Sequence, residues 1–295
     1  MSIAVVITDR NTDDLCAHLR RHLPDVNIQV FPDITDPQAV RLAVLWAHPP
    51  GITAGMNNLQ AVTSMGAGMD HIDADTTILQ ELPRWRIVTP VLKQNMAQYV
   101  LTHVLHRHRH VAAYRTQQSA AVWKVLEIEQ PMPTIGFLGL GELGAFVANQ
   151  CAALGFNTVA WTRSQQHPVH PCYHGESGLQ RVCAASDYLV VLLPLNTQTR
   201  HIINRRTLAW CRTGATLINV ARGAHVHEEA VLQALDSGLL SHAVLDVFDN
   251  EPLPAGHAFW THPGITLTPH SSARSDVAQT AETIIGQYRS LPEPG

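Results

Sequence analysis

A six-residue glycine-rich stretch, Gly139-Leu-Gly-Glu-Leu-Gly144, restricts the fold of this chain more than any other feature. The apolar run 135–138 before it is typical of a short strand, and the apolar pattern of 143–154 predicts a helix. Glycines at these positions allow a tight turn, a close backbone approach and tight packing of helix on strand. A glycine pattern alone is a weak signal. Between a strand and a helix, it predicts a binding site for the pyrophosphate of a dinucleotide.

Strand-like and helix-like segments alternate on both sides of this loop. Strand patterns cover 3–7, 28–31, 42–46, 61–65 and 86–88 before it, and 158–161, 188–193, 216–220, 243–248 and 265–267 after it. Helical patterns cover 13–22, 95 to about 114, and 275–289. This alternation predicts two doubly wound α/β domains with parallel sheets, Rossmann-like or flavodoxin-like. We expect a substrate domain at 1–98 plus 270–295, interrupted by a dinucleotide-binding domain at 99–269.

Composition argues against several other classes of protein. With 45 % hydrophobic residues, 15 % charged residues and a net charge of −4, the 295-residue chain can build a sizeable core but has no basic surface for nucleic acid. No apolar run reaches the roughly 18 residues that a membrane helix needs. The five cysteines are scattered and form no Cys-x-x-Cys pair. Reduced thiols in the cytoplasm are therefore expected.

The residues after the second strand of the dinucleotide domain indicate which cofactor binds. NAD sites place Asp or Glu there, about twenty residues after the loop, to hold the ribose 2′-hydroxyl. This chain has Thr162, Arg163 and Ser164 instead. A guanidinium suits the dianionic 2′-phosphate of NADP. We therefore expect NADP to be preferred, with NAD possible; an arginine that only stacks on adenine would fit the same position.

Three polar residues, Arg222, Glu251 and His270, follow successive apolar runs after the loop. Ligands bind in open α/β sheets at the ends of the strands. A guanidinium there suits a carboxylate, and an imidazole with an ordinary pKa of about 6.5 can exchange a proton near neutral pH. A carboxylate beside the imidazole favours the protonated ring. The three residues predict an enzyme that acts on a small anion.

A cluster of histidines and arginines at 106–110 is not expected to bind a metal. Alternate residues on a helix point to different faces, and no thiol or carboxylate accompanies these side chains. We interpret the cluster as a solvated or interface face and predict no metal site.

Taken together, the motifs resemble the D-isomer-specific 2-hydroxyacid dehydrogenases over nearly the whole chain. The resemblance is carried by the segments GAGMDH at 66–71, VLLPL at 191–195, NVARG at 219–223 and LDVF at 245–248, with Glu251-Pro252 after the last. Within the family, the segments at 46–50, 161–164 and 259–263 are most similar to the bacterial glyoxylate/hydroxypyruvate reductases, which typically prefer NADPH. The chain departs from the family pattern at Gln98, His227 and Ser271-Ser272.

The resemblance implies a reaction in which NADPH reduces a small 2-keto acid, glyoxylate or hydroxypyruvate, to glycolate or D-glycerate. His270 would donate a proton, Glu251 would orient and charge the imidazole, and Arg222 would hold the substrate carboxylate. Substrate contacts are implied for Trp46, Met65, Gly66, Ala67, Gly68 and Arg222. Motif positions and resemblance together predict cofactor contacts at Gly139, Leu140, Gly141, Glu142, Leu143, Gly144, Thr162, Arg163, Ser164, Leu193, Pro194, Thr199, Val220, Ala221, Asp246 and Ser272.

The polar segment 114–130 carries Trp123 and is expected to join the two domains. In the family this region crosses onto a partner subunit. The resemblance therefore implies a homodimer formed through the cofactor domain, with Trp123 near the interface or the partner's active site; a surface loop is the alternative. Two other functions stay open at this point. One is an NAD-linked D-lactate or D-glycerate type dehydrogenase, and the other is a non-catalytic NAD(H)-sensing corepressor, which can keep the same three residues.

Overall fold

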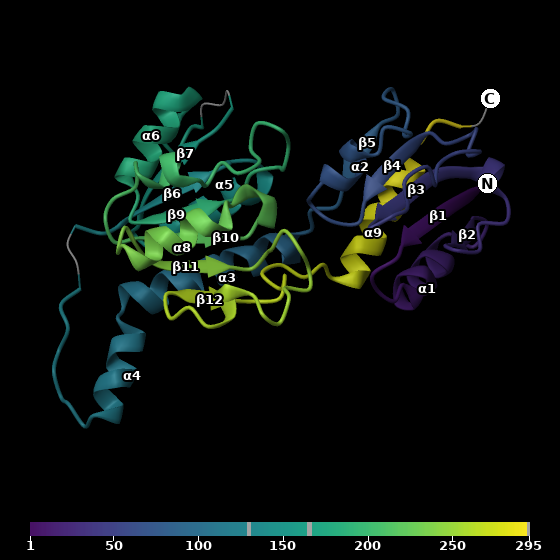
Figure 1. The fold of residues 1–295 in the computed structure, drawn as a ribbon. Helices are drawn as coiled ribbons and strands as arrows, with labels where there is room; N and C mark the ends of the chain where they lie inside the picture. Colours follow the sequence, from purple (N-terminus) through teal and green to yellow (C-terminus); the bar gives the residue numbers. More distant parts are fainter. Residues whose placement is uncertain (129–130, 164–166, 294–295) are drawn as a thin grey trace. The chain divides into compact units, whose positions relative to one another are not determined.

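The structure is a computed structural model that describes residues 1–128, 131–163 and 167–293. The chain forms two compact units, one from Met1–Leu92 with Ser275–Gly295 and one from Lys93–Arg274 (Figure 1). The second unit is thus inserted in the first, but its ends lie at 93 and 274, whereas 99 and 269 were expected. The earlier start has a physical reason, because Met96 and Ala97 are already buried in the core of the second unit.

The first unit is built on a five-stranded parallel sheet with the order β2-β1-β3-β4-β5. Its strands are β1 (Ser2–Ile7), β2 (Asn27–Val30), β3 (Val40–Trp46), β4 (Ala61–Ser64) and β5 (Arg84–Arg86). Its helices are α1 (Asp13–His22), α2 (Asp70–Ala74), the short 3₁₀ turn η1 (Pro37–Ala39) and the C-terminal α9 (Val277–Arg289). The strand order reverses between β1 and β3, as in flavodoxin-like folds.

Burial explains why these segments form a sheet covered on both faces. Every residue of β1 is buried, which is typical of a parallel strand between two layers of helices. On one face, Ile284 and Ile285 of α9 pack with Ile3 and Val5, so the C-terminal helix returns to the N-terminal sheet as expected. A second apolar cluster, which includes Ile72 of α2, covers the other face.

The second unit is built on a seven-stranded parallel sheet with the order β12-β11-β10-β9-β6-β7-β8. Its strands are β6 (Thr134–Leu138), β7 (Asn157–Trp161), β8 (Cys172–Tyr173), β9 (Tyr188–Val191), β10 (Ala215–Asn219), β11 (Leu240–Leu245) and β12 (Ile265–Leu267). Its helices are α3 (Pro90–His108), which begins in the first unit, α4 (Val111–Ser119), α5 (Glu142–Ala153), α6 (Gly175–Ala185), α7 (Arg205–Leu208) and α8 (Glu228–Asp236), with the 3₁₀ turns η2 (Gly223–His225) and η3 (Ala258–Trp260). The order reverses between β6 and β9, as in Rossmann folds. The predicted fold class, two doubly wound parallel-sheet domains, is confirmed.

Three local expectations were wrong. The fifth strand lies at Arg84–Arg86, whereas 86–88 was expected, because its ladder with β4 ends where Ser64 pairs with Arg86. The two-residue strand β8 was not expected at all. The segment 114–130 does not join the two units, since it lies within the second one. Its residues 114–119 belong to α4, which projects from that unit (Figure 1).

No helix within the described ranges is both long enough and apolar enough to cross a membrane.

Candidate active site

The glycine-rich loop follows β6, where the strand order of the second sheet reverses. Gly139 has a φ of +101°, and a Cβ there would lie 2.7 Å from the carbonyl oxygen of Leu192. A Cβ on Gly144 would overlap the carbonyl oxygen of Gly139, whereas Gly141 faces open space. Because α5 begins at Glu142, the free N–H groups of its first turn lie at the loop. The loop therefore fits the pyrophosphate of a dinucleotide.

The predicted determinants of cofactor choice follow β7. Thr162 is buried, and its N–H donates to the carbonyl of Tyr173 at 2.9 Å. The next residue, Arg163, is exposed at the carboxyl end of the strand, so its guanidinium is accessible to an anion. Ser164 lies outside the described residues.

Three predicted cofactor contacts, Leu193, Pro194 and Thr199, lie in the loop that follows β9. The hydroxyl of Thr199 donates to the carbonyl of Pro194 at 2.7 Å and accepts from the N–H of Asn196 at 2.9 Å. Thr199 thereby fixes the segment from Pro194 to Thr199, which follows Leu193. Leu193 packs against the apolar core of the unit, and the predicted contacts of this loop with a cofactor stay predictions.

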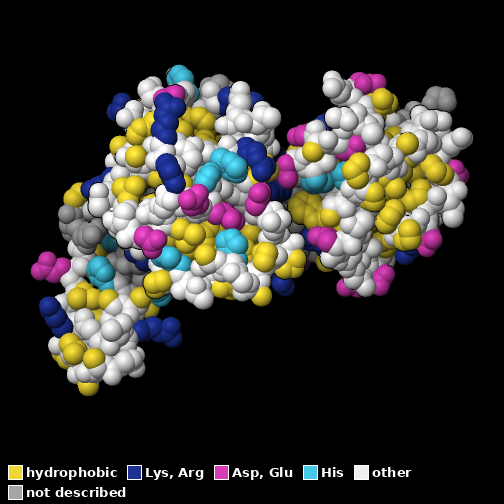
Figure 2. All heavy atoms as spheres, viewed as in Figure 1, with side chains coloured by type: hydrophobic (Ala, Val, Ile, Leu, Met, Phe, Trp, Pro, Cys, Tyr) yellow, Lys and Arg dark blue, Asp and Glu magenta, His cyan; other side chains and the backbone are white. Residues whose placement is uncertain are grey.

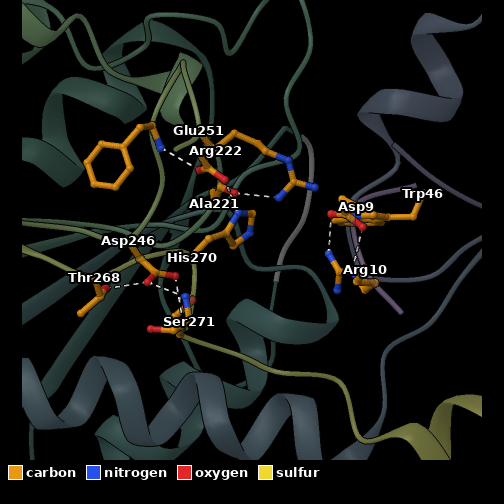
Figure 3. Close-up of polar contacts among 12 residues, drawn as sticks. Asp9, Arg10, Trp46, Ala221, Arg222, Asp246, Glu251, Thr268, His270 and Ser271 are labelled. Atoms are coloured by element: carbon orange, nitrogen blue, oxygen red, sulfur yellow. Dashed lines mark hydrogen bonds and ion pairs between the residues drawn. The ribbon is translucent and has the colours of Figure 1, made fainter. Parts of the chain in front are cut away.

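His270 and Glu251 form an ion pair (Figure 3), with 2.8 Å between Nδ1 and Oε2. The N–H of Phe248 donates to the other carboxylate oxygen at 2.9 Å. Burial alone raises the pKa of Glu251, but these two hydrogen bonds and the charges of His270 and Arg222 outweigh it and hold the pKa below its usual range. An ionised carboxylate only accepts hydrogen bonds, so Nδ1 carries a proton. Proton exchange is therefore left to Nε2.

The backbone of His270 is held in a rarely populated conformation by Asp246. His270 has a φ of +49°, a region that non-glycine residues seldom adopt. Asp246 is fully buried, and its carboxylate accepts from the N–H groups of Ser271 at 2.8 Å and Ser272 at 2.9 Å. Its carbonyl accepts from the N–H of His270 at 2.8 Å. Asp246 thus fixes the loop that presents the imidazole; the predicted contacts of Asp246 and Ser272 with a cofactor stay predictions.

Two further residues of this support were not identified from the sequence. The hydroxyl of Thr268 donates to Asp246 at 2.5 Å and lies 2.5 Å from the hydroxyl of Tyr99, which must therefore be the donor to Thr268. Burial raises the pKa of Tyr99 to about 12, so this donor keeps its proton. No sequence motif marks the pair, since they meet only when α3 packs beside the end of β12.

Arg222 lies beside the His270–Glu251 pair (Figure 3). It follows β10 and the buried residues Val220 and Ala221, and its Nη1 donates to the carbonyl of Ala221 at 2.8 Å. Gly223 is required next to it, because a Cβ there would overlap the backbone of Phe248. The second unit therefore brings the three predicted polar residues into one cluster.

In the first unit, the glycine loop 66–68 follows β4. Ser64 braces it, since the Ser64 hydroxyl donates to the carbonyl of Gly68 at 2.6 Å and accepts from the N–H of Gly66 at 3.3 Å. The N–H groups of Ala67 and Gly68 donate to no other residue of the described chain. Two adjacent N–H groups without an acceptor can bind an anion.

Trp46 covers this loop and is itself fixed. A Cβ on Gly66 would lie 3.0 Å from the Trp46 ring, so the ring is in contact with the loop backbone. Met65, also a predicted substrate contact, is only 9 % exposed and belongs largely to the core. The indole N–H of Trp46 donates to Asp9 at 3.0 Å, and Asp9 accepts two hydrogen bonds from Arg10.

Asp9 and Arg10 were not identified from the sequence. They follow β1 after Thr8, and a charged pair just beyond the first strand is the signal that could have identified them. Hydrogen bonds from Arg10 lower the pKa of Asp9 most; the charge of Arg10 and the indole N–H of Trp46 lower it further, against the effect of partial burial.

No group of three or more His, Cys, Asp or Glu side chains within residues 1–128, 131–163 and 167–293 is arranged to hold a metal ion. The histidine cluster lies on α3 and just beyond it, where His106, Arg107 and His110 line a cavity of about 330 Å³ with His103 and His242.

Known proteins are similar to this chain in both sequence and fold. The family model for the D-isomer specific 2-hydroxyacid dehydrogenase, NAD binding domain, matches residues 101–272. Glyoxylate/hydroxypyruvate reductase A of Serratia proteamaculans (strain 568) is 35 % identical over 270 residues, which cover 89 % of this chain and 86 % of that protein.

Two solved structures illustrate the similarity in fold. A D-isomer specific 2-hydroxyacid dehydrogenase from Xanthobacter autotrophicus Py2, in complex with NADPH and MES, has a TM-score of 0.90 at 32 % identity, over 98 % of this chain and 93 % of that chain. The NADPH-dependent glyoxylate/hydroxypyruvate reductase from Sinorhizobium meliloti, in complex with NADP and sulfate, has a TM-score of 0.87 at 31 % identity, over 99 % and 96 % of the two chains. The resemblance drawn from the sequence motifs is thus confirmed, and the chain belongs to the D-isomer-specific 2-hydroxyacid dehydrogenase family of NAD(P)-dependent oxidoreductases.

Proposed function

We propose that this protein reduces glyoxylate and hydroxypyruvate to glycolate and D-glycerate with NADPH, and that His270 is the general acid. The observation that carries the proposal is the His270–Glu251 ion pair at 2.8 Å beside Arg222, which combines a proton donor with a carboxylate-binding cation. The similar proteins named glyoxylate/hydroxypyruvate reductase support the choice of substrates.

NADP is the proposed cofactor, and it supplies the hydride when bound as NADPH. The backbone of the 139–144 loop and the N-terminus of α5 would hold its pyrophosphate, and Arg163 would hold its 2′-phosphate. The accessible guanidinium of Arg163 supports this choice, as do the two similar structures in complex with NADPH or NADP.

The proton reaches the substrate through a fixed imidazole. Glu251 holds Nδ1–H and favours the imidazolium, so Nε2 carries the proton that the developing alkoxide takes up. Arg222 binds the substrate carboxylate with its planar fork. We propose separately that the N–H groups of Ala67 and Gly68 bind a carboxylate oxygen. General acid catalysis of this kind contributes roughly 10²–10⁴-fold to the rate.

Steady-state oxidation of NADPH and NADH with glyoxylate, hydroxypyruvate and pyruvate tests the proposal. We expect turnover of the first two acids, a higher kcat/KM with NADPH, and a roughly 10²–10⁴-fold lower kcat in His270→Gln. An inert wild-type protein that still binds the cofactor would indicate a sensing function instead. A rate that His270→Gln leaves unchanged would exclude His270 as the acid.

We also propose that the chain forms a homodimer through its second unit and works in the cytoplasm. Trp123 is 100 % exposed and Val125 79 % exposed, on the segment that follows α4. Figure 2 shows apolar side chains on this projecting part. Large apolar side chains that gather on a surface commonly mark an interface. The five free cysteines support a reducing compartment.

A further inference from the structure

An arginine lies at the point of the first sheet where α/β proteins bind ligands. The strand order β2-β1-β3-β4-β5 reverses between β1 and β3. Ligands bind beyond the carboxyl ends of the strands at such a reversal. Asp9 and Arg10 follow β1 there, Trp46 ends β3, and the 66–68 loop follows β4.

Arg10 is oriented by its neighbours and keeps one donor nitrogen available. Its Nε and Nη2 donate to the two carboxylate oxygens of Asp9 at 2.9 and 2.8 Å. Its guanidinium carbon lies 5.4 Å from the centroid of the Trp46 ring (Figure 3). Nη1 donates to no residue of the described chain, and 46 % of the side chain is exposed. Because these contacts already orient the guanidinium, less conformational entropy is lost when it binds a ligand.

The Asp9–Arg10 pair is connected to the 66–68 loop through Trp46. The indole N–H donates to Asp9, and the ring contacts Gly66. Neighbouring strands are about 4.8 Å apart, so the ends of β1 and β4, with β3 between them, are separated by about 10 Å. A three-carbon acid and an arginine side chain can span that separation together. A keto acid held by its carboxylate at Ala67 and Gly68 can therefore reach Arg10 with the group at its third carbon.

The chemistry of the pair selects one kind of group. Its two charges cancel, so the pair attracts a second carboxylate on the substrate less than an unpaired guanidinium would. A hydroxyl can accept a hydrogen bond from Nη1 of Arg10. A methyl group cannot, and its presence would leave Nη1 without a partner.

We propose that Arg10, held by Asp9 and by Trp46, is a specificity-determining residue that binds the C3 hydroxyl of a 3-hydroxy-2-keto acid. The inference rests on the proposed function, and it makes hydroxypyruvate the substrate that this site recognises best. Glyoxylate has no third carbon and gains nothing from Arg10.

The test compares kcat/KM for hydroxypyruvate and glyoxylate, with NADPH, in the wild type, Arg10→Ala, Arg10→Lys and Arg21→Ala. Loss of a hydrogen bond from a charged donor typically lowers kcat/KM by about tenfold or more. We expect that loss for hydroxypyruvate in Arg10→Ala, a change of less than about twofold for glyoxylate, and partial recovery in Arg10→Lys. The exposed Arg21 on α1 is the matched control and should change neither value.

The outcomes separate the inference from the function on which it rests. If Arg10 only braces Trp46, kcat/KM falls equally for both acids and the proposed recognition is wrong. The inference is also overturned if Arg10→Ala leaves the ratio of kcat/KM for hydroxypyruvate to kcat/KM for glyoxylate unchanged. A wild-type protein that turns over neither acid overturns the proposed function and the inference together.

Discussion

At the scale of single residues, the two members of the His270–Glu251 pair have different parts in the proposed proton transfer: His270 donates the proton, and Glu251 supports His270. Glu251 is kept ionised by its donors, so it can both orient the imidazole and favour its protonated form. Glu251→Gln keeps a carbonyl oxygen that can accept from Nδ1 but removes the charge. We expect kcat/KM for glyoxylate to fall, because an amide supports an imidazolium less than a carboxylate does. Steady-state rates with NADPH would show this; an unchanged kcat/KM would mean that the charge of Glu251 does not act in the reaction.

Arg163 is the residue on which cofactor preference is expected to depend. Its side chain is exposed, so replacing it should not disturb the core. Arg163→Ala should raise KM for NADPH by about tenfold or more and leave KM for NADH nearly unchanged, because only NADPH carries the 2′-phosphate. Arg109→Ala, at another exposed arginine of the second unit, is the control. Equal losses with both cofactors would indicate that Arg163 only stacks on adenine.

At the scale of elements, the sequence predicts strands well where burial is two-sided, and it misses a strand that is too short to form a pattern. β1 and β6 were recognised because parallel strands covered on both faces are nearly continuous apolar runs. β8 has two residues, Cys172 and Tyr173, and leaves no periodic pattern. α4 was partly missed because it has no buried residue in the chain as described, so it lacks the apolar face on which helix prediction depends.

That same lack of a buried face makes α4 and the segment after it the best place to test assembly. We expect the wild-type protein to be a dimer at micromolar concentration, and Trp123→Ser combined with Val125→Ser to raise the dimer dissociation constant by at least about tenfold. Light scattering after size-exclusion chromatography at several concentrations measures this. Trp260→Ser, at a 54 % exposed tryptophan of the same unit, is the control and should leave the dimer intact. A monomeric wild type would contradict the proposal.

At the scale of the whole molecule, the sequence predicts those parts of the site that lie in short motifs. Arg222, Glu251 and His270 each follow an apolar run, and the topology brings them to one sheet edge. Asp9 and Arg10 carry no motif, and their importance depends on which strand lies beside which. The contact between Tyr99 and Thr268 joins residues 169 positions apart, and no local pattern encodes it. Strand order and helix packing are therefore what sequence reasoning lacked.

The stability of the whole fold should depend on pH through His242. Burial lowers the pKa of His242 from 6.5 to about 4, and the charges of Arg107, His103, His106 and His262 act in the same direction. Between these two values the unfolded chain takes up a proton that the folded chain does not, so stability is complete above pH 6.5 and declines as the pH falls toward 4. Glu251 acts in a separate range, since its lowered pKa affects stability only below its ordinary value of 4.5.

Thermal unfolding between pH 7.5 and 4.5 checks this expectation. The wild-type Tm should fall over that range, and His242→Gln should flatten the fall, because glutamine can keep the hydrogen bond to Thr266 without a group that titrates. His18→Gln, at a partly exposed position on α1, should retain the full wild-type slope. If the Tm of His242→Gln falls between pH 6.5 and 4.5 by as much as the Tm of the wild type, the pH dependence arises elsewhere. His242 would then be ruled out as its source.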